Sequence, residues 1–468
     1  MFVEGVAMLL ALFVSLLYHG YDKTAFIICS AINLSLGGLI IFFTRNARPD
    51  IGRHEGYIIV SLVWVVFSLF GSLPYIISGA IPDFTNAFFE TISGFTTTGS
   101  SIMTDIESLP HGILFWRSIS QWLGGMGIIV LSLAILPVFG IGGMQLFMAE
   151  VPGPTPDRIS PRIRQTAKTL WGIYLIFTVV EILLLWGAGM GLFDAVCHSF
   201  TTMATGGFST KQASIAHWSS PAIHYIIIVF MIIAGTNFTL SYMAIRGRFT
   251  RIIRDEEFKY YILFIFIFTL VIFSGLLITT EYEIEHAFRD SLFQVVSIIT
   301  TTGFATTDYL TWKPVLYLII FSLFFFGGSA GSTGGGIKIM RIVLLLKNSY
   351  YELKRMVHPH AVIPVKFNNN SVDSKIITNV LAFFMFYFAI FAASTVIFSL
   401  IEPDMESAMG AVATSLGNIG PGLGNVGPSE TFLHIKPVGK WFLSFLMLLG
   451  RLELFTVLVL FSPSFWRE

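Results

Sequence analysis

The hydrophobic positions of this chain fall into long runs separated by short polar segments. About 20 consecutive apolar residues are needed for a helix to span the hydrocarbon core of a bilayer, and ten runs come near or above that length. The pattern predicts a chain that is helical throughout and lies in a membrane. The predicted spans are 2–19, 25–44, 57–80, 113–138, 170–190, 221–245, 258–279, 314–346, 374–401 and 437–461.

Four shorter apolar segments lie between paired spans, and each ends in a turn and a glycine. A segment of about 12 residues rises only about 18 Å as a helix, little more than half of the bilayer core. A half-crossing with irregular backbone is stable in a membrane only where it is buried in protein or lines water. The segments align without gaps as Asn86–Gly99, Asp194–Gly207, Asp290–Gly303 and Ser407–Gly420, with Ser93, Thr201, Ser297 and Thr414 six residues before each glycine.

These patterns predict an all-α integral membrane protein. We expect four pseudo-symmetric units, each a helix, a pore helix and a second helix, arranged around a central pore. Two further transmembrane helices precede them. The expected parts are 1–50 for the two N-terminal helices and 51–145, 146–250, 251–350 and 351–468 for units one to four.

The composition supports a membrane protein. Of the 468 residues 54% are hydrophobic and 12% charged, with a mean hydropathy of +0.76, whereas soluble domains average about 25% charged residues. The first 20 residues lack a basic region and a cleavage site, so they are expected to form a retained helix rather than a signal peptide. Cys29 and Cys197 lie in apolar runs and predict neither a disulfide framework nor a metal cluster.

The basic residues are unevenly divided between the two sides of the predicted membrane. Cytoplasmic linkers of membrane proteins carry an excess of Lys and Arg. The richer side is therefore expected to be cytoplasmic, with both termini inside and the glycine turns open to the outside. That side carries Arg45, Arg48, Arg53, Arg158, Arg162, Arg164, Lys168, Arg246, Arg248, Arg251, Arg254, Lys259, Arg341, Lys347, Lys354, Arg355, Lys366 and Lys375, and the other Lys23, Lys211, Arg289, Lys313, Lys436 and Lys440.

The glycine turns carry the chemistry of a cation filter. An ion that enters a narrow pore exchanges its water shell for oxygen ligands such as backbone carbonyls, and glycine permits the backbone that presents them. The alternative is that small residues merely let helices pack closely; four ungapped copies favour the filter. The predicted ligand positions are Thr97, Thr98, Gly99, Thr205, Gly206, Gly207, Thr301, Thr302, Gly303, Asn418, Ile419 and Gly420, where the fourth copy departs by having Asn418 in place of Thr.

The second span of the third unit is interrupted by the glycine-rich segment 327–336. A phosphate-binding loop is disfavoured because the GK[ST] ending and a preceding strand are missing. A flexible kink between packed helices is one interpretation, and a gate below the filter is the favoured one. The predicted gating residues are Gly327, Gly328, Gly331, Gly334, Gly335, Gly336, Lys338 and Arg451.

Three of the charged residues inside predicted membrane segments bear on the predicted site. Arg451 is expected either to pair with Glu453 or another acidic group, or, as we favour, to place a positive charge beside the conduction path. Arg117 lies near the outer end of its span and can snorkel or pair. Glu90, inside the first pore helix, is expected to be a buried hydrogen-bonding residue rather than an ion ligand.

The repeat resembles the Trk/Ktr/HKT superfamily of potassium transporters, and the two extra N-terminal spans are most similar to its bacterial TrkH branch. The resemblance covers nearly the whole chain, and its signature of one glycine per filter segment falls on Gly99, Gly207, Gly303 and Gly420. It implies that K⁺ is the transported ion. It also implies that glycine at position 99 favours K⁺ over Na⁺. It further implies an intramembrane gating loop in the third unit, and the family has an arginine at a place in the last helix similar to that of Arg451.

The same resemblance implies a homodimer in the bacterial cytoplasmic membrane and a cytosolic nucleotide-binding subunit of the Trk A type, for which linkers 147–169 and 347–373 are candidate docking segments. No organic cofactor, nucleotide or nucleic acid is expected to bind this chain. The leading hypothesis is a channel-like K⁺ uptake protein. An Na⁺- or H⁺-coupled carrier with broken helices is the alternative, and an enzyme is disfavoured because acid–base residues do not cluster in the sequence.

Overall fold

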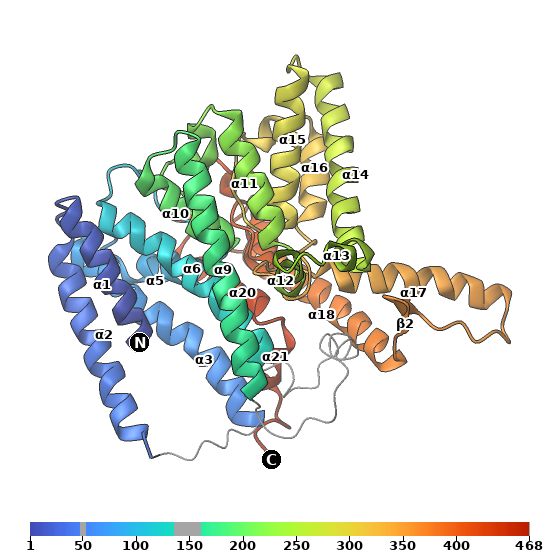
Figure 1. Ribbon diagram of the computed structural model, residues 1–468, viewed down its shortest axis with the longest axis horizontal. Coiled ribbons are helices and arrows are strands. Elements are labelled where there is room, and N and C mark those ends of the chain that lie inside the picture. Colours follow the sequence, from blue (N-terminus) through green and yellow to red (C-terminus); the bar gives the residue numbers. More distant parts are fainter. Residues whose placement is uncertain (47–52, 135–160, 468) are drawn as a thin grey trace.

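The same order of helices occurs four times along the chain. The structure, a computed structural model, describes residues 1–46, 53–134 and 161–467 (Figure 1). In each group a long helix precedes a short helix, a turn and a second helix. The groups are α3 (Arg53–Gly71) with α4 (Leu73–Ser78), α5 (Phe84–Phe95) and α6 (His111–Ala134); α9 (Pro161–Gly187), α10 (Leu192–Met203), α11 (Pro221–Ala234) and α12 (Phe238–Ile245); α14 (Glu256–Thr279), α15 (Ile284–Ile299), α16 (Pro314–Leu323) and α17 (Ile339–Val357); and α18 (Ser374–Ser399), α19 (Met405–Gly417), α20 (Pro437–Arg451) and α21 (Phe455–Leu458).

The remaining elements connect or precede these groups. Two helices precede the first group and pack against each other and against its members. These two helices are α1 (Phe2–Leu17) and α2 (Lys23–Thr44). The others are short elements that follow the turns or lie between or after the groups. They are α13 (Phe249–Arg254), the 3₁₀ turns η1 (Ser214–His217), η2 (Tyr309–Thr311), η3 (Gly424–Val426), η4 (Phe432–His434) and η5 (Val459–Phe461), and strands β1 (Lys366–Phe367) and β2 (Asn370–Ser371).

Local sequence signals explain where many of these helices begin. Proline stands at the start of α11, α16 and α20, where its missing N–H costs no intrahelical bond. The short helices α5 and α19 begin at Asp83 and Asp404, whose carboxylates accept hydrogen bonds from the backbone N–H groups of Asn86 and Ser407. The same start signals therefore recur at equivalent places in different groups.

Five described helices are long and apolar enough to cross a membrane, or seven if two bent pairs each count as one span. The expectation of unbroken spans at 221–245 and 437–461 is wrong. The first bends by 110° between α11 and α12, and the second by 112° between α20 and α21. A third interruption separates α16 from α17, as expected. The end of the predicted span 113–138 lies outside the described residues.

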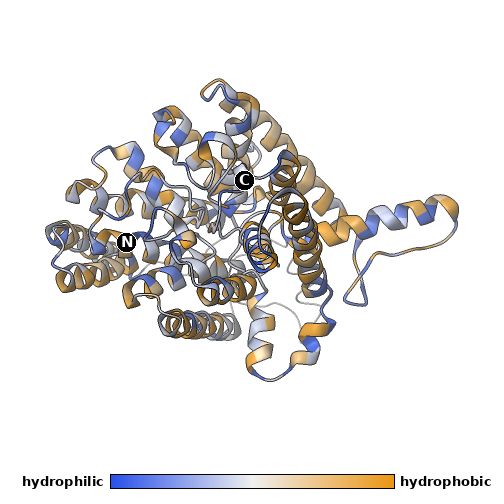
Figure 2. Cartoon of the chain, turned by 90° about the horizontal axis from the view of Figure 1, so that it is seen from above, coloured by the Kyte–Doolittle hydropathy of each residue, from blue (hydrophilic) through white to orange (hydrophobic). Residues whose placement is uncertain are grey.

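The molecule is apolar on its outer surface as well as in its core. Figure 2 shows hydrophobic colouring along the peripheral helices, and side chains such as Leu9, Phe13, Ile40 and Phe266 are exposed. Buried positions instead include many polar residues, among them every threonine of the four turns. This distribution is typical of a protein whose solvent is lipid.

The expectation of a purely helical chain needs one small correction. Strands β1 and β2 pair antiparallel as a short hairpin, with Lys366 opposite Ser371. Asn368 and Asn369, between the strands, have positive φ, a backbone that asparagine tolerates in tight turns. The hairpin follows α17, which projects away from the rest of the molecule (Figure 1).

Helices of successive groups pack in a closed order. The second helix of one group lies against the short helix of the next: α6 contacts α10, α11 contacts α15, and α20 contacts α5 of the first group. The end of α16 likewise approaches α19, because a Cβ added at Gly417 would lie 3.1 Å from the Phe324 carbonyl oxygen. The four short helices are thus brought to one central region.

Candidate functional site: the four glycine turns

The four turns share one backbone conformation. The glycines at 99, 207, 303 and 420 have φ of +85°, +75°, +82° and +109°. Two residues earlier, Thr97, Thr205, Thr301 and Asn418 have φ of +53°, +53°, +58° and +54°. Left-handed φ is unfavourable for a β-branched residue and persists only where the surrounding structure imposes it. The unusual backbone that the repeat predicts is present in all four copies.

Each glycine lies against the backbone of the next turn. A Cβ added at Gly99 would overlap the Gly206 carbonyl oxygen, and one at Gly207 would overlap that of Thr302. A Cβ at Gly303 would overlap the Ile419 carbonyl oxygen. A Cβ at Gly420 would lie 2.9 Å from the Thr98 carbonyl oxygen, which closes the circle. The structure therefore brings all twelve predicted filter residues into one ring of backbone.

A second ring of hydrogen bonds lies just beyond the glycines. In every copy the carbonyl oxygen two residues after the glycine accepts a hydrogen bond from the preceding group. The donors differ in kind, being side chains in two cases and backbone N–H groups in two. They are Arg117 Nη1 to Ser209 (3.0 Å), Ile215 and Ala216 N–H to Ala305 (3.1 and 3.2 Å), the Tyr309 hydroxyl to Gly422 (2.7 Å) and Phe432 N–H to Ser101 (2.9 Å).

The hydroxyl residues six places before the glycines act mainly through their backbone. The Ser93, Thr201, Ser297 and Thr414 carbonyl oxygens accept hydrogen bonds from the N–H groups of Thr98, Gly206, Thr302 and Ile419 at 2.9, 2.8, 2.8 and 3.1 Å. These bonds fold each turn back onto the end of its short helix. The Ser297 hydroxyl also contacts the backbone after the turn, since its Oγ donates to the Phe304 carbonyl oxygen at 2.7 Å.

A buried ion pair joins Glu90 of the first short helix, α5, to Arg117 of α6. Of the two expectations for Arg117, pairing is therefore the one that the structure shows. The two side chains are 0% and 1% exposed, and Arg117 Nη2 lies 2.9 Å from Glu90 Oε1. Glu90 also accepts hydrogen bonds from the Ser101 hydroxyl and the Ile102 N–H. His198 takes the equivalent place in the second copy and contacts Ser209 Oγ at 3.0 Å. These polar contacts fix the short helices to the segments that follow the turns.

The interrupted segment between α16 and α17 lies against the second and third groups close to their turns. Gly335 N–H donates to the Thr301 hydroxyl (2.7 Å), and Thr333 Oγ1 donates to the Met203 (3.0 Å) and Ala234 (3.2 Å) carbonyl oxygens. Residues 324–338 contain no helix. We call this segment, which includes all six predicted gating glycines and Lys338, the inner loop. Lys338 Nζ donates to the Gly334 carbonyl oxygen within it.

Arg451 holds the inner loop from the last group. Its buried guanidinium donates to the Thr333 carbonyl oxygen at 2.7 Å and lies 3.5 Å from that of Gly124 in α6. The alternative pairing with Glu453 is not what the structure shows, because Glu453 binds Arg341 at 2.5 Å. Arg451 thus contacts the loop and the first group, at the point where α20 ends.

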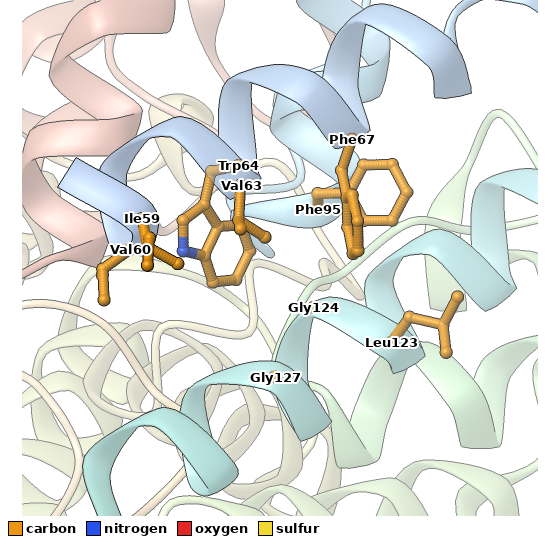
Figure 3. Close-up of a pocket in the computed structure, with 9 residues that line it drawn as sticks. All are labelled: Ile59, Val60, Val63, Trp64, Phe67, Phe95, Leu123, Gly124 and Gly127. Carbon is orange, nitrogen blue, oxygen red and sulfur yellow. The ribbon is translucent and has the colours of Figure 1, made fainter. Parts of the chain in front are cut away.

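An apolar cavity of about 140 Å³ lies beside the first turn (Figure 3). Figure 3 shows residues of α3 and α6 on its two sides, with Phe95 from the end of α5 reaching between them. Its lining is almost entirely hydrocarbon. The cavity therefore offers a cation almost no ligands and is not a candidate ion site.

Comparisons with known proteins decide the family of this chain. A family model described as TrkH, a cation transport protein, matches residues 22–468. The chain belongs to the TrkH family. Relatives include the Trk system potassium uptake protein TrkH of Escherichia coli K12, 44% identical over 97% of this chain and 95% of the relative, and TrkI of Halomonas elongata, 36% identical over 100% and 95%.

The solved structure of the potassium transporter TrkH from Vibrio parahaemolyticus matches with a TM-score of 0.91 and 40% identity, over 99% of this chain and 96% of that one. TrkH family members are multi-pass membrane transport proteins and not enzymes. The expectations that this chain is a membrane transport protein and that it is not an enzyme are therefore confirmed. The fold is therefore that of a solved transporter over almost its entire length.

Four features around the site were not predicted from the sequence. They are the Arg341–Glu453 pair, the break at Glu453 and Leu454, the break between α11 and α12, and the contacts of Gln121 with the second turn. The break before α12 had a signal, since Gly235 precedes Asn237, whose side chain caps α12. The residues between α20 and α21 include neither glycine nor proline, and Glu453 among them pairs with Arg341 of α17.

We expect the buried Glu90–Arg117 pair to be essential for stability. Glu90→Gln leaves the Arg117 charge buried without its counter-charge, which costs about 3–5 kcal/mol and lowers the melting temperature of the detergent-solubilised protein. The matched control is Glu352→Gln, because the Glu352–Arg355 pair is exposed (55% and 30%) and such pairs contribute about 0–1 kcal/mol. Equal melting temperatures for the two variants would contradict this assignment.

Proposed function

We propose that this protein is a channel-like potassium uptake protein. K⁺ moves inward through the ring formed by the four glycine turns, driven by a negative membrane potential, and the inner loop gates its passage. The ring is the observation that supports this most directly. Its backbone comes from four equivalent segments in one orientation, as a pore on a pseudo-fourfold axis requires.

The ring offers the ligands that K⁺ needs. A filter replaces the hydration shell of the ion by backbone carbonyl oxygens, and we propose that those of residues 97–99, 205–207, 301–303 and 418–420 line the path. The close contact between each glycine and the next turn leaves no room for a side chain. The relatives are named potassium uptake proteins, which supports K⁺ as the ion.

Three contacts of the inner loop support its role as the gate. It is bonded to the second turn region through Met203, to the third through Thr301 and to the last group through Arg451. We propose that these hydrogen bonds hold the closed state, and that Arg451 adds a positive charge that raises the barrier to cations. Opening would require the Thr333–Arg451 contact to break.

A coupled carrier remains the second candidate, because the bends after α11 and α20 are the broken helices that such carriers use. The four copies share one orientation, whereas carriers are commonly built from inverted repeats. The reversal potential distinguishes the two. A K⁺ pore reverses at the potassium equilibrium potential, and a carrier shifts with the gradient of its second ion.

We also propose the organisation that the resemblance implies: an inner-membrane homodimer with both termini and the basic linkers in the cytoplasm, associated with a nucleotide-binding subunit. Residues 147–160 of the first docking linker lie outside the described residues. The second includes most of α17, whose Tyr350, Leu353 and Met356 are exposed. This projecting helix offers apolar surface suited to a protein partner.

Replacing Gly303 by Ser is expected to lower the K⁺/Na⁺ permeability ratio about tenfold, equivalent to about 1.4 kcal/mol. The added side chain would overlap the Ile419 carbonyl oxygen, and φ of +82° is strained for serine. The ratio is read from reversal potentials of the purified protein in bilayers with K⁺ on one side and Na⁺ on the other. Gly38→Ser is the control, since a Cβ at Gly38 meets no atom within 4 Å. An unchanged ratio for Gly303→Ser would remove this residue from the filter.

Deleting residues 329–333 is expected to raise basal K⁺ flux into liposomes several-fold, because the Arg451–Thr333 anchor and the obstructing backbone are lost together. The K⁺/Na⁺ ratio should stay near that of the intact protein, since the filter glycines are untouched. Size-exclusion and melting measurements establish that the variant is folded. Unchanged or abolished flux in folded protein would argue against the gate.

A further inference from the structure

One side chain of the first group, Gln121, is hydrogen-bonded to the second turn on both sides of Gly207. Gln121, in α6, is completely buried. Its Nε2 donates to the Gly206 carbonyl oxygen at 2.6 Å, and its Oε1 accepts from the Phe208 N–H at 3.1 Å. The two bonded groups belong to the peptide planes on either side of Gly207. One amide therefore fixes both planes around the filter glycine.

This contact replaces hydroxyl groups that two other turns possess. In the first turn Thr96 and Thr98 join their hydroxyls at 2.8 Å, and in the third Thr300 and Thr302 do the same at 2.8 Å. The second turn has Ala204 and Gly206 at these places and so lacks both hydroxyls. In place of that hydroxyl pair, Gln121 forms hydrogen bonds to Gly206 and Phe208.

The identity of residue 206 fits this role. A Cβ there would overlap the Gln121 amide, whereas the equivalent residues of the other turns are Thr98, Thr302 and Ile419. Glycine at 206 makes room for the amide but also frees the backbone, and a free backbone needs an external restraint. The Gly206 carbonyl oxygen is, in addition, the atom against which Gly99 packs.

We propose that Gln121 is a positioning residue of the ion filter: it fixes the Gly206 and Gly207 peptide planes and thereby sets ion selectivity. This inference rests on the proposed filter. Gln121 need not contact the ion. By holding the Gly206 carbonyl oxygen and the Phe208 N–H together, it prevents either peptide plane from rotating, so the second turn keeps the spacing that the first turn requires.

The test uses two variants of the full-length protein in liposomes. Gln121→Met keeps the size of the side chain but removes both hydrogen bonds, and should lower the K⁺/Na⁺ permeability ratio about tenfold, equivalent to about 1.4 kcal/mol. Gln121→Glu cannot donate to Gly206 when ionised and should lose selectivity at alkaline pH. On protonation the carboxyl group can donate to Gly206 and accept from Phe208, so acid pH should restore most of the ratio.

The controls separate this inference from the proposed function. Gln165→Glu makes the same chemical change at an exposed site of α9 and should behave as the wild type at every pH. If Gly303→Ser shifts the ratio but neither Gln121 variant does, Gln121 is not a positioning residue and the filter stands. If none of the three shifts it, both proposals are overturned.

A structural role alone would not give pH-dependent rescue. If Gln121→Met does not fold, the comparison rests on one folded preparation of Gln121→Glu measured at two pH values. A ratio that rises on acidification more than that of the wild type supports the inference. A ratio that follows the wild type overturns it.

Discussion

The structure depends on one constraint: backbone with left-handed φ inside a membrane must have its polar groups satisfied by protein. The four glycine turns meet it together, because each glycine packs on a carbonyl of the next turn and each following segment receives a hydrogen bond from the preceding group. None of the turns is complete by itself. A single group would leave strained, unpaired backbone exposed to lipid, so the four must close as a ring.

The irregular elements of the inner half follow from the same closure. The inner loop and the break after α11 exchange backbone hydrogen bonds, since Ser329 N–H donates to the Gly235 carbonyl oxygen at 2.8 Å. The end of α20 places Arg451 against Thr333. Broken helices are tolerated at membrane depth where they are buried or line a cavity. The break after α11 and the end of α20 therefore both contact the inner loop, the segment that we propose as the gate.

The sequence repeat predicted the helical class, the four short helices, the glycine turns and the interrupted third group, because each has a local signal in periodicity or glycine spacing. It did not predict the bend at Glu453, because residues 452–454 include neither Gly nor Pro and the partner of Glu453, Arg341, lies on another helix. The contact of Gln121 with Gly206 could not be predicted for the same reason, because 85 residues separate the two in the sequence. Contacts between distant segments leave no periodic trace in one sequence.

The central claim is that the four turns form an ion site on one axis. A crystal structure of the protein grown in Rb⁺, with anomalous diffraction, tests it most directly, since Rb⁺ resembles K⁺ and can be located. The account predicts Rb⁺ density enclosed by the carbonyl oxygens of residues 97–99, 205–207, 301–303 and 418–420. A well-ordered ring without density, together with Rb⁺ bound elsewhere in the membrane region, would contradict it.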